Sequence, residues 1–394
     1  MAGSVTTGSG VIRQTAESTR IGYRRGSVVV DVETADADTN RWLAEFLSPW
    51  VDVVPYGVGS AAVCLAFSAP TYDALERRRS EPAHPKVACF ALDGHTVELP
   101  AWRDAEDLVI ADVDGGCFYR VRDRSVDIVA RPGHRRHRIG LMRVVREILV
   151  APECSRDSVV DLHAAAFAAR RGAVVIAGAK RAGKTTLLAH ALSSGGVSLV
   201  ANDRVLVDVS SHQPEVVGIP TFVSIRADTL RLFPALRRSA AERPAILHAG
   251  ELRVDGVCLP ADDLARHGFT LSPAQFAERL GAVHTRRARL AAIVFPEICA
   301  AVDSWRLESL HGAERVELLG QSLYGARVAG ERQTVFGGLA RATSRAANQA
   351  TTAERFLAHV PFLRCRLGPE AYHAGGAAWL RSLDSHLAES RHDA

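Results

Sequence analysis

The chain has 394 residues, of which 47% are hydrophobic and 23% are charged, and its net charge is +4. This length predicts two or three domains, and so much apolar sequence excludes global disorder. A net charge this small gives no reason to expect a nucleic-acid partner. The seven cysteines form no C-x-x-C pair, and no apolar run approaches the length of a membrane span. We therefore expect a cytoplasmic protein with neither a membrane nor a nucleic acid as its partner.

The first part of the chain is predicted to contain a flexible N-terminus, residues 1–20, and an α+β N-terminal domain, residues 21–132. The flexible segment is rich in Gly, Ser and Thr. A short helix is expected over 38–47. Short apolar runs separated by Asp, Gly and Pro predict strands over 28–32, 51–54, 61–67, 85–92, 95–99, 107–112 and 117–121. No catalytic motif is visible in this domain, which is interpreted either as a recognition or dimerisation unit or as scaffolding.

A second domain is predicted over residues 133–331, and it contains the most informative segment of the chain. An amphipathic helix is expected over 137–150. The apolar run 174–176 predicts a buried strand, residues 178–185 fit the pattern G-x-x-x-x-G-K-[ST], and a helical pattern follows. A phosphate-binding loop requires this succession of strand, loop and helix. We therefore predict that the chain binds a nucleoside triphosphate, with ATP as the expected nucleotide.

Each feature of this loop has a physical role. Gly178 and Gly183 allow a tight turn that points backbone N–H groups at phosphate oxygens, and the following helix N-terminus adds partial positive charge. Lys184 can reach the β- and γ-phosphates, and the Thr185 hydroxyl can bind Mg²⁺. The predicted nucleotide-binding residues are Gly178, Ala179, Lys180, Arg181, Ala182, Gly183, Lys184, Thr185 and Thr186.

Further strands are expected after the loop helix, over 197–200, 205–209, 216–217, 223–226 and 291–295. An Arg-rich insertion is predicted over about 237–289. The C-terminal region, 332–394, is predicted to be mainly helical, with a short strand over 362–367 and a last helix over 375–387.

Two residues outside the loop are candidates for the same site. Asp203 follows the strand 197–200, and in an open parallel sheet the carboxyl ends of strands gather around the ligand. A carboxylate there can hold Mg²⁺ or accept a proton from an attacking hydroxyl. His163 precedes the loop strand and could orient Asp203 or contact the γ-phosphate. The alternatives are a packed histidine at His163 and an Asp203 that only pairs with Arg204.

The order of these motifs resembles the nucleotide-binding core of the HPr kinase/phosphorylase superfamily, and more closely its HPr-kinase-related members. The resemblance rests on His163, on the loop 178–186 and on the run 199–205, with its Asn-Asp-Arg sequence. It covers about residues 143–208. It implies an α/β P-loop kinase fold, an ATP- and Mg²⁺-dependent transfer of the γ-phosphate to a hydroxyl, and catalytic roles for Asp203, His163 and Lys184. Thr185 and Asp203 would hold the metal.

The chain departs from the pattern of that superfamily in three places. The paired acids are replaced by Asn202 and Asp203, which leaves Asp203 as the favoured base. The Gly-rich segment that HPr kinases use for their protein substrate is not found, so HPr is not the expected acceptor. No second metal-binding acid is assigned, and Glu215 and Asp228 are only guesses.

Three functions stay open at this point. The favoured one is a kinase that acts on a peptide, protein or small-molecule acceptor. The second is a nucleotide-dependent ATPase or switch acting on a protein partner, and the third is a nucleotide-binding module that has lost catalysis. The sequence leaves open whether the chain forms a homo-oligomer.

Overall fold

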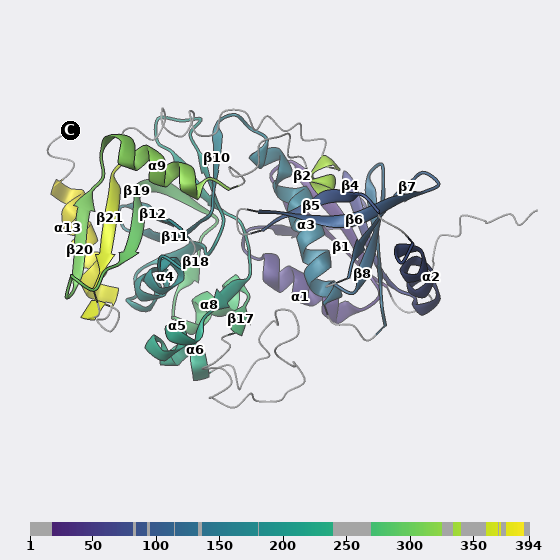
Figure 1. The fold of residues 1–394 in the computed structure, drawn as a ribbon, viewed down its shortest axis with the longest axis horizontal. Coiled ribbons are helices and arrows are strands. Elements are labelled where there is room, and N and C mark those ends of the chain that lie inside the picture. Colours follow the sequence, from purple (N-terminus) through teal and green to yellow (C-terminus); the bar gives the residue numbers. More distant parts are fainter. Residues whose placement is uncertain are drawn as a thin grey trace, which may run out of the picture.

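The computed structural model describes residues 18–81, 84–92, 95–113, 115–132, 136–179, 181–238, 269–324, 334–339, 360–368, 370–371 and 376–389. Within these ranges the protein is a mixed α/β structure with two large mixed sheets lying side by side along the long axis (Figure 1). None of the helices in the described ranges is long and apolar enough to cross a membrane.

The first sheet is built from the N-terminal part of the chain in the order β3-β1-β2-β4-β9-β8-β7-β6-β5. β2 is parallel to β4 and β4 to β9, whereas the other pairs are antiparallel. Its strands are β1 (Thr19–Arg25), β2 (Val28–Thr34), β3 (Asp52–Val54), β4 (Ala61–Phe67), β5 (Lys86–Leu92), β6 (His95–Asp104), β7 (Asp107–Asp112), β8 (Cys117–Arg122) and β9 (Ser125–Ala130). The predicted strands of this region are therefore confirmed, while β1 and β9 were not predicted.

Two helices accompany the first sheet, α1 (Ala37–Leu47) and α2 (Ala69–Arg79). The side chain of Asp36 accepts a hydrogen bond from the Thr39 N–H group and caps α1, which confirms the helix expected there. Ser68 caps α2 in the same way and a proline stands in its first turn, a start signal that the sequence prediction missed.

The second sheet follows the path β10-β14-β15-β19-β12-β11-β13-β18, and β21 lies between β19 and β20. Its strands are β10 (Val159–Leu162), β11 (Ala164–Ala169), β12 (Gly172–Ala177), β13 (Ser198–Ala201), β14 (Val205–Asp208), β15 (Glu215–Gly218), β18 (Val283–His284), β19 (Arg287–Ile298), β20 (Trp305–Ser309) and β21 (Phe362–Leu367). The expectation of an open parallel sheet is wrong, because β11 is antiparallel to both β12 and β13. The range predicted as an insertion, 237–289, contains β18 and the start of β19, which belong to this sheet.

The remaining elements are helices and a separate two-stranded sheet of β16 and β17. They are α3 (His137–Cys154), α4 (Lys184–Ser193), β16 (Val223–Ile225), α5 (Ala227–Leu232), α6 (Pro234–Arg238), β17 (Phe269–Leu271), α8 (Pro273–Arg279), α9 (Gly312–Ser322), α10 (Val335–Gly338) and α13 (Gly376–Glu389). The helices predicted over 137–150 and 375–387 are thus present as α3 and α13. Most of the C-terminal region expected to be helical, including 340–359, lies outside the described residues.

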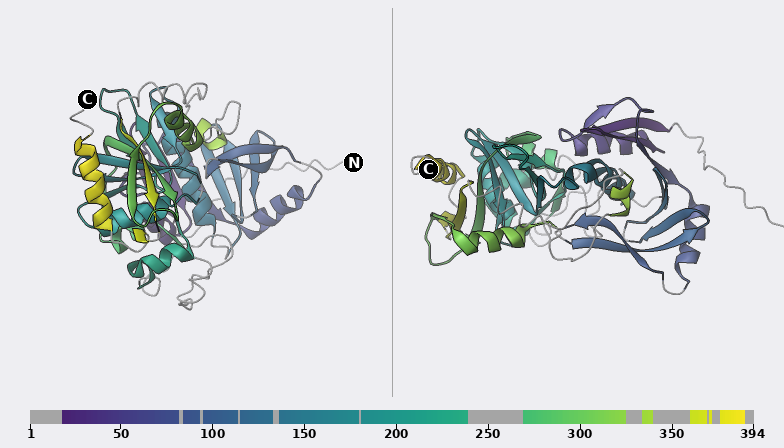
Figure 2. Two further views of the ribbon diagram at one scale, coloured as in Figure 1. Left: turned by 60° about the vertical axis from the view of Figure 1, so that its left-hand side comes forward. Right: turned by 90° about the horizontal axis from the view of Figure 1, so that it is seen from above.

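The buried core runs through α3. This helix packs against β2 and β4 of the first sheet and against β10 of the second, and two further views show it between the sheets (Figure 2). One cluster of buried apolar side chains includes Val30 from β2, Val145 from α3 and Ile176 from β12. The two sheets therefore share a core. The division into domains 21–132, 133–331 and 332–394 stays a prediction.

Candidate functional site

The predicted phosphate-binding loop connects β12 to α4, as the sequence indicated. Gly178 has a φ of 138° and Gly183 a φ of 99°, and residues with a side chain rarely adopt these backbone conformations. Arg181 has a φ of 72° and is exposed. Such a backbone conformation is uncommon for a residue with a side chain and is typical of functional loops.

The N-terminus of α4 carries no side-chain cap, since its first flanking residue is Gly183. The first backbone N–H groups of a helix have no partner within the helix, so an anion can take their place. Position 183 also lies close to neighbouring strands, because a Cβ there would stand 3.5 Å from Leu367 Cδ1 and 3.8 Å from Ile298 Cγ1. The loop is therefore held against the carboxyl ends of β19 and β21.

Lys184 is buried, with 9% of its surface exposed. Its Nζ donates hydrogen bonds to the Gly178 carbonyl oxygen at 2.8 Å and to the Ala179 carbonyl oxygen at 3.1 Å. These two hydrogen bonds keep the ammonium group inside the curve of the loop. A phosphate group bound there would meet a positive charge that is already in place.

The other loop residues have varied surroundings. Thr185 is half-buried at the first turn of α4, where it was predicted to bind the metal. The Thr186 hydroxyl lies 3.2 Å from the hydroxyl of Thr229 in α5, so its side chain faces away from the loop. Ala182 donates its N–H to the Ala179 carbonyl oxygen and closes a turn. Lys180 lies outside the described residues.

The order of the strands brings His163 and Asp203 to the edge of the sheet that carries the loop. Ala164 pairs with Ala177, the residue before Gly178, so His163 lies beside the start of the loop. Ala166 pairs with Ala201, two residues before Asp203. Because β11 runs antiparallel between them, β12 and β13 point the same way, and their carboxyl ends meet the amino end of β11. The sheet is mixed and not parallel as expected, but Asp203 still follows the carboxyl end of β13 at the edge that carries the loop.

His163 and Asp203 contact each other at this edge. His163 Nε2 lies 3.1 Å from Asp203 Oδ1, and both side chains are more than two thirds buried. Burial by itself would raise the pKa of Asp203, but the hydrogen bond and charge of His163 and the charges of Lys184 and Arg146 outweigh it, so the pKa is lowered. Asp203 is therefore a carboxylate at neutral pH, able to bind a cation or to orient the imidazole.

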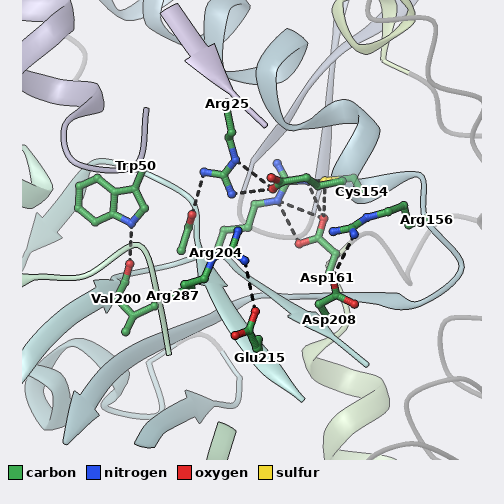
Figure 3. A network of polar contacts seen from close by, with 12 residues as sticks. Arg25, Trp50, Cys154, Arg156, Asp161, Val200, Arg204, Asp208, Glu215 and Arg287 are labelled. Atoms are coloured by element: carbon green, nitrogen blue, oxygen red, sulfur yellow. Dashed lines mark hydrogen bonds and ion pairs between the residues drawn. The ribbon is translucent and has the colours of Figure 1, made fainter. Parts of the chain in front are cut away.

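Arg204 does not pair with Asp203, and its charge is used elsewhere. Its guanidinium group binds the Asp161 carboxylate, with Nη2 at 2.6 Å from Oδ2, and both side chains are nearly inaccessible. Glu147 of α3 lies 3.6 Å from Arg204 Nη1 and also accepts a hydrogen bond from Arg146. The pair Arg204–Asp161 is seen in Figure 3 beside Cys154. Arg204 is consequently a buried structural cation behind the His163–Asp203 pair.

Asn202 also has a structural environment. Its side-chain amide donates to the Phe222 carbonyl oxygen at 3.0 Å and accepts from the Thr221 hydroxyl at 3.1 Å. Both hydrogen-bonding ends are used to hold the segment before β16. An amide suits this position better than a carboxylate, because only an amide can donate to the carbonyl group.

Among the described residues, no second acidic side chain is a candidate ligand for a metal bound by Asp203. Glu215 pairs with Arg287 at the far end of β15, where it lies opposite Asp208, so it is remote from Asp203. The side chain of Asp228 lies outside the described part of the chain. No group of three or more His, Cys, Asp and Glu side chains suited to a metal occurs among the residues that the structure describes. Thr185 and Asp203 therefore stay the two predicted metal donors. One carboxylate suits Mg²⁺, because this ion is usually bound through one or two carboxylates together with phosphate oxygens.

Sequence reasoning missed several residues that shape this site. Asp161, Glu147 and Arg146 carry buried charges behind Asp203, and Tyr324 stacks on Arg204 with 4.2 Å between the guanidinium carbon and the ring centre. The sequence feature that could have indicated them is a charged residue inside an apolar run, such as Arg146 and Glu147 of α3. No family model matches the chain, and a search of curated proteins found no match.

Proposed function

We propose that this protein is a P-loop kinase of the HPr-kinase-related type that transfers the γ-phosphate of ATP to a hydroxyl group. The observation that carries the proposal is the contact between His163 and Asp203 at the edge of the sheet from which the loop 178–185 departs. A phosphate-binding loop alone is common to many nucleotide-binding proteins. A carboxylate beside it, oriented by a histidine, adds a group suited to an acceptor hydroxyl.

The chain supplies a distinct group for each requirement of the reaction. The N–H groups of the loop and the Lys184 ammonium would hold the phosphates, and Thr185 and Asp203 would hold Mg²⁺, which neutralises phosphate charge when bound. Asp203 would receive or share the proton of the acceptor hydroxyl, whose oxygen forms the new bond to phosphorus. The bond from phosphorus to the β–γ bridging oxygen breaks, and ADP leaves. His163 would keep the carboxylate in the required rotamer.

The surroundings of Asp203 support its role, because it is an ionised carboxylate and no arginine among the described residues forms an ion pair with it. Arg204, which could have neutralised it, is bound to Asp161 instead. An Asp203 paired with a guanidinium would be occupied on both oxygens and less suited to a metal or a hydroxyl. Because Arg204 is bound to Asp161, Asp203 is left with His163 as its partner, which is the partner that a catalytic carboxylate needs.

The test is transfer of labelled γ-phosphate from ATP into a soluble extract of the source cells, with Mg²⁺. Wild type, Lys184→Ala and Asp203→Asn are compared. A labelled product that appears with wild type and with neither variant supports the kinase and identifies its acceptor. Tight ATP binding by wild type without transfer argues for a silent binding module. ATP hydrolysis stimulated by a protein partner, without a labelled acceptor, argues for a switch.

A further inference from the structure

The strand that leads to Asp203 contains a β-bulge at Val200. Along the pair of β11 and β13, Ala166 lies opposite Ala201 and Phe167 lies opposite Leu199, so Val200 has no opposite residue. On the other side of β13, pairing with β18 covers Ser198 and Leu199. A bulge bends its strand and changes the direction in which the following residues leave the sheet. The following residues here are Ala201, Asn202 and Asp203.

The carbonyl group of this bulged residue is bound by a side chain from the first part of the chain. Trp50 Nε1 donates a hydrogen bond to the Val200 carbonyl oxygen at 2.8 Å (Figure 3). Trp50 is 2% exposed, and its ring makes an edge contact with His284 of β18, with ring centres 5.5 Å apart. The indole is therefore fixed by packing on one side and by the bulge on the other.

A glycine makes this approach feasible. A Cβ at Gly218 of β15 would collide with both the Val200 carbonyl oxygen and the indole nitrogen of Trp50. The Gly218 carbonyl oxygen accepts a hydrogen bond from Arg25 of β1 at 3.0 Å, and Arg25 also binds Glu153 of α3 at 2.7 Å. Gly218 in turn pairs with Val205, two residues after Asp203.

The segment 200–205 is thus held from both ends by residues of the N-terminal part of the chain, Trp50 between α1 and β3 and Arg25 in β1. Trp50 holds the strand before Asp203, and Arg25 holds the partner of the strand after it. The ring of Phe46 in α1 contacts the ring of Phe222 at a tilt of 52°, with ring centres 4.7 Å apart, and the Phe222 carbonyl group binds Asn202. These contacts converge on the turn that carries the candidate catalytic carboxylate.

We infer that Trp50 is a positioning residue for Asp203, acting through its hydrogen bond to the bulged carbonyl group of Val200. The inference rests on the proposed function for its kinetic effect, but not for its structural effect. This role would give the N-terminal part of the chain a function at the site. From the sequence, that part was interpreted as a recognition or dimerisation unit or as scaffolding. Without the indole N–H group, the bulge loses its partner and Asp203 moves relative to the loop.

The experiment compares Trp50→Phe with the matched control Trp379→Phe in the full-length protein. Trp379 is also fully buried, and its Nε1 donates to Cys365 Sγ in β21 of the same sheet, away from Asp203. Each variant removes one buried indole hydrogen bond. We expect Trp50→Phe to lower kcat by about ten- to a hundredfold, because small displacements of a catalytic group have effects of that size. KM for ATP stays within about twofold, since the loop itself is not altered.

A second readout does not require activity. The ring nitrogen signals of His163 are followed by NMR of ¹⁵N-histidine-labelled protein and assigned by their loss in His163→Gln. We expect Trp50→Phe to shift these signals and Trp379→Phe to leave them in place. If Trp50→Phe does not fold, Trp50 is replaced by 3-benzothienylalanine, which keeps the shape of the indole and lacks the N–H group.

The outcomes separate this inference from the proposed function. Equal losses of kcat in both variants, or unchanged His163 signals in Trp50→Phe, would overturn the positioning role. If wild type transfers no phosphate but the His163 signals shift only in Trp50→Phe, the kinase proposal fails and the positioning of Asp203 by Trp50 stands.

Discussion

His163 Nε2 and Asp203 Oδ1 lie 3.1 Å apart, and each residue stands in a short connection between two strands of the second sheet. His163 joins β10 to β11, and Asp203 lies between β13 and β14. The two connections are neighbours because β10 pairs with β14 and β11 pairs with β13. The contact is therefore a product of topology, and it places a carboxylate and an imidazole beside the phosphate-binding loop.

Replacing Asp203 by Asn should abolish most of the transfer activity, by about 10²- to 10⁴-fold, because a group that takes the acceptor proton contributes that much. The same variant tests the pH dependence of stability. The pKa of Asp203 is lower in the folded protein than the ordinary value of 3.8 for an aspartate. Its stabilising contribution is thus fully present above that value and is lost as the pH falls through the lower folded pKa.

The free energy of unfolding of wild type and Asp203→Asn, measured by urea denaturation at pH 7 and near pH 3, checks this expectation. The difference between the two proteins should shrink at the lower pH. Asp38→Asn serves as the control, since the Asp38 side chain is 70% exposed and pairs with the equally exposed Arg41. A difference for Asp203→Asn that grows as the pH falls would contradict the assignment.

Nucleotide binding should depend on Lys184 and not on the other described lysine. Lys184 lies inside the loop, whereas Lys86 is exposed on β5. Lys184→Ala removes the charge that faces the phosphates, so we expect ATP affinity to fall by about tenfold or more, in line with a charge-assisted hydrogen bond worth 1.5–3 kcal/mol. Lys86→Ala should leave the affinity unchanged. Isothermal titration with ATP and Mg²⁺ measures both, and equal affinities in all three proteins would mean that the loop does not bind the nucleotide.

The buried pair Arg204–Asp161 should matter for stability far more than an exposed pair in the same sheet. Asp161→Asn leaves the Arg204 charge buried beside a neutral group, and removing one partner of a buried pair costs about 3–5 kcal/mol. Glu215→Gln breaks the exposed pair with Arg287, whose side chains are 44% and 62% exposed, and such a pair contributes about 0–1 kcal/mol. Urea denaturation at neutral pH compares the two variants. Similar losses would show that the pair Arg204–Asp161 is not buried.

Two glycines within helices should respond in opposite ways to the same substitution. Gly376, in the first turn of α13, packs against α4, and a Cβ there would collide with the His190 carbonyl oxygen. Gly320 of α9 has nothing within 4 Å of the position that its Cβ would take. Gly320→Ala should therefore stabilise the protein by about 0.5–1 kcal/mol through helix propensity. Gly376→Ala should destabilise it, because α13 must move away from α4. Thermal unfolding measures both signs, and a stabilising Gly376→Ala would contradict the close packing of these helices.

The local sequence was sufficient for most elements of the first sheet and for the loop itself. Short apolar runs separated by Asp, Gly and Pro indicated the strands 61–67 and 107–112, which the structure contains as β4 and β7. The succession of an apolar run, the loop 178–185 and a helix is a local pattern, so it could be located without knowledge of the fold. Strand β1 was missed, because its Arg-rich sequence Thr19–Arg25 lacks a clear apolar alternation.

The loop could be located from the amino-acid sequence alone, by its glycines, its lysine and its place between a strand and a helix. Those features depend on residues that are neighbours in the chain. Only the tertiary structure decided that His163 contacts Asp203, that Arg204 binds Asp161, and that Trp50 reaches the bulge at Val200. These contacts join residues far apart in the chain, and strand order, pairing register and a one-residue bulge set them. A shift of one residue in register would send each side chain to the other face of the sheet. Since β10 and the start of β11 are buried on both faces, apolar alternation in the sequence does not specify the register of these strands.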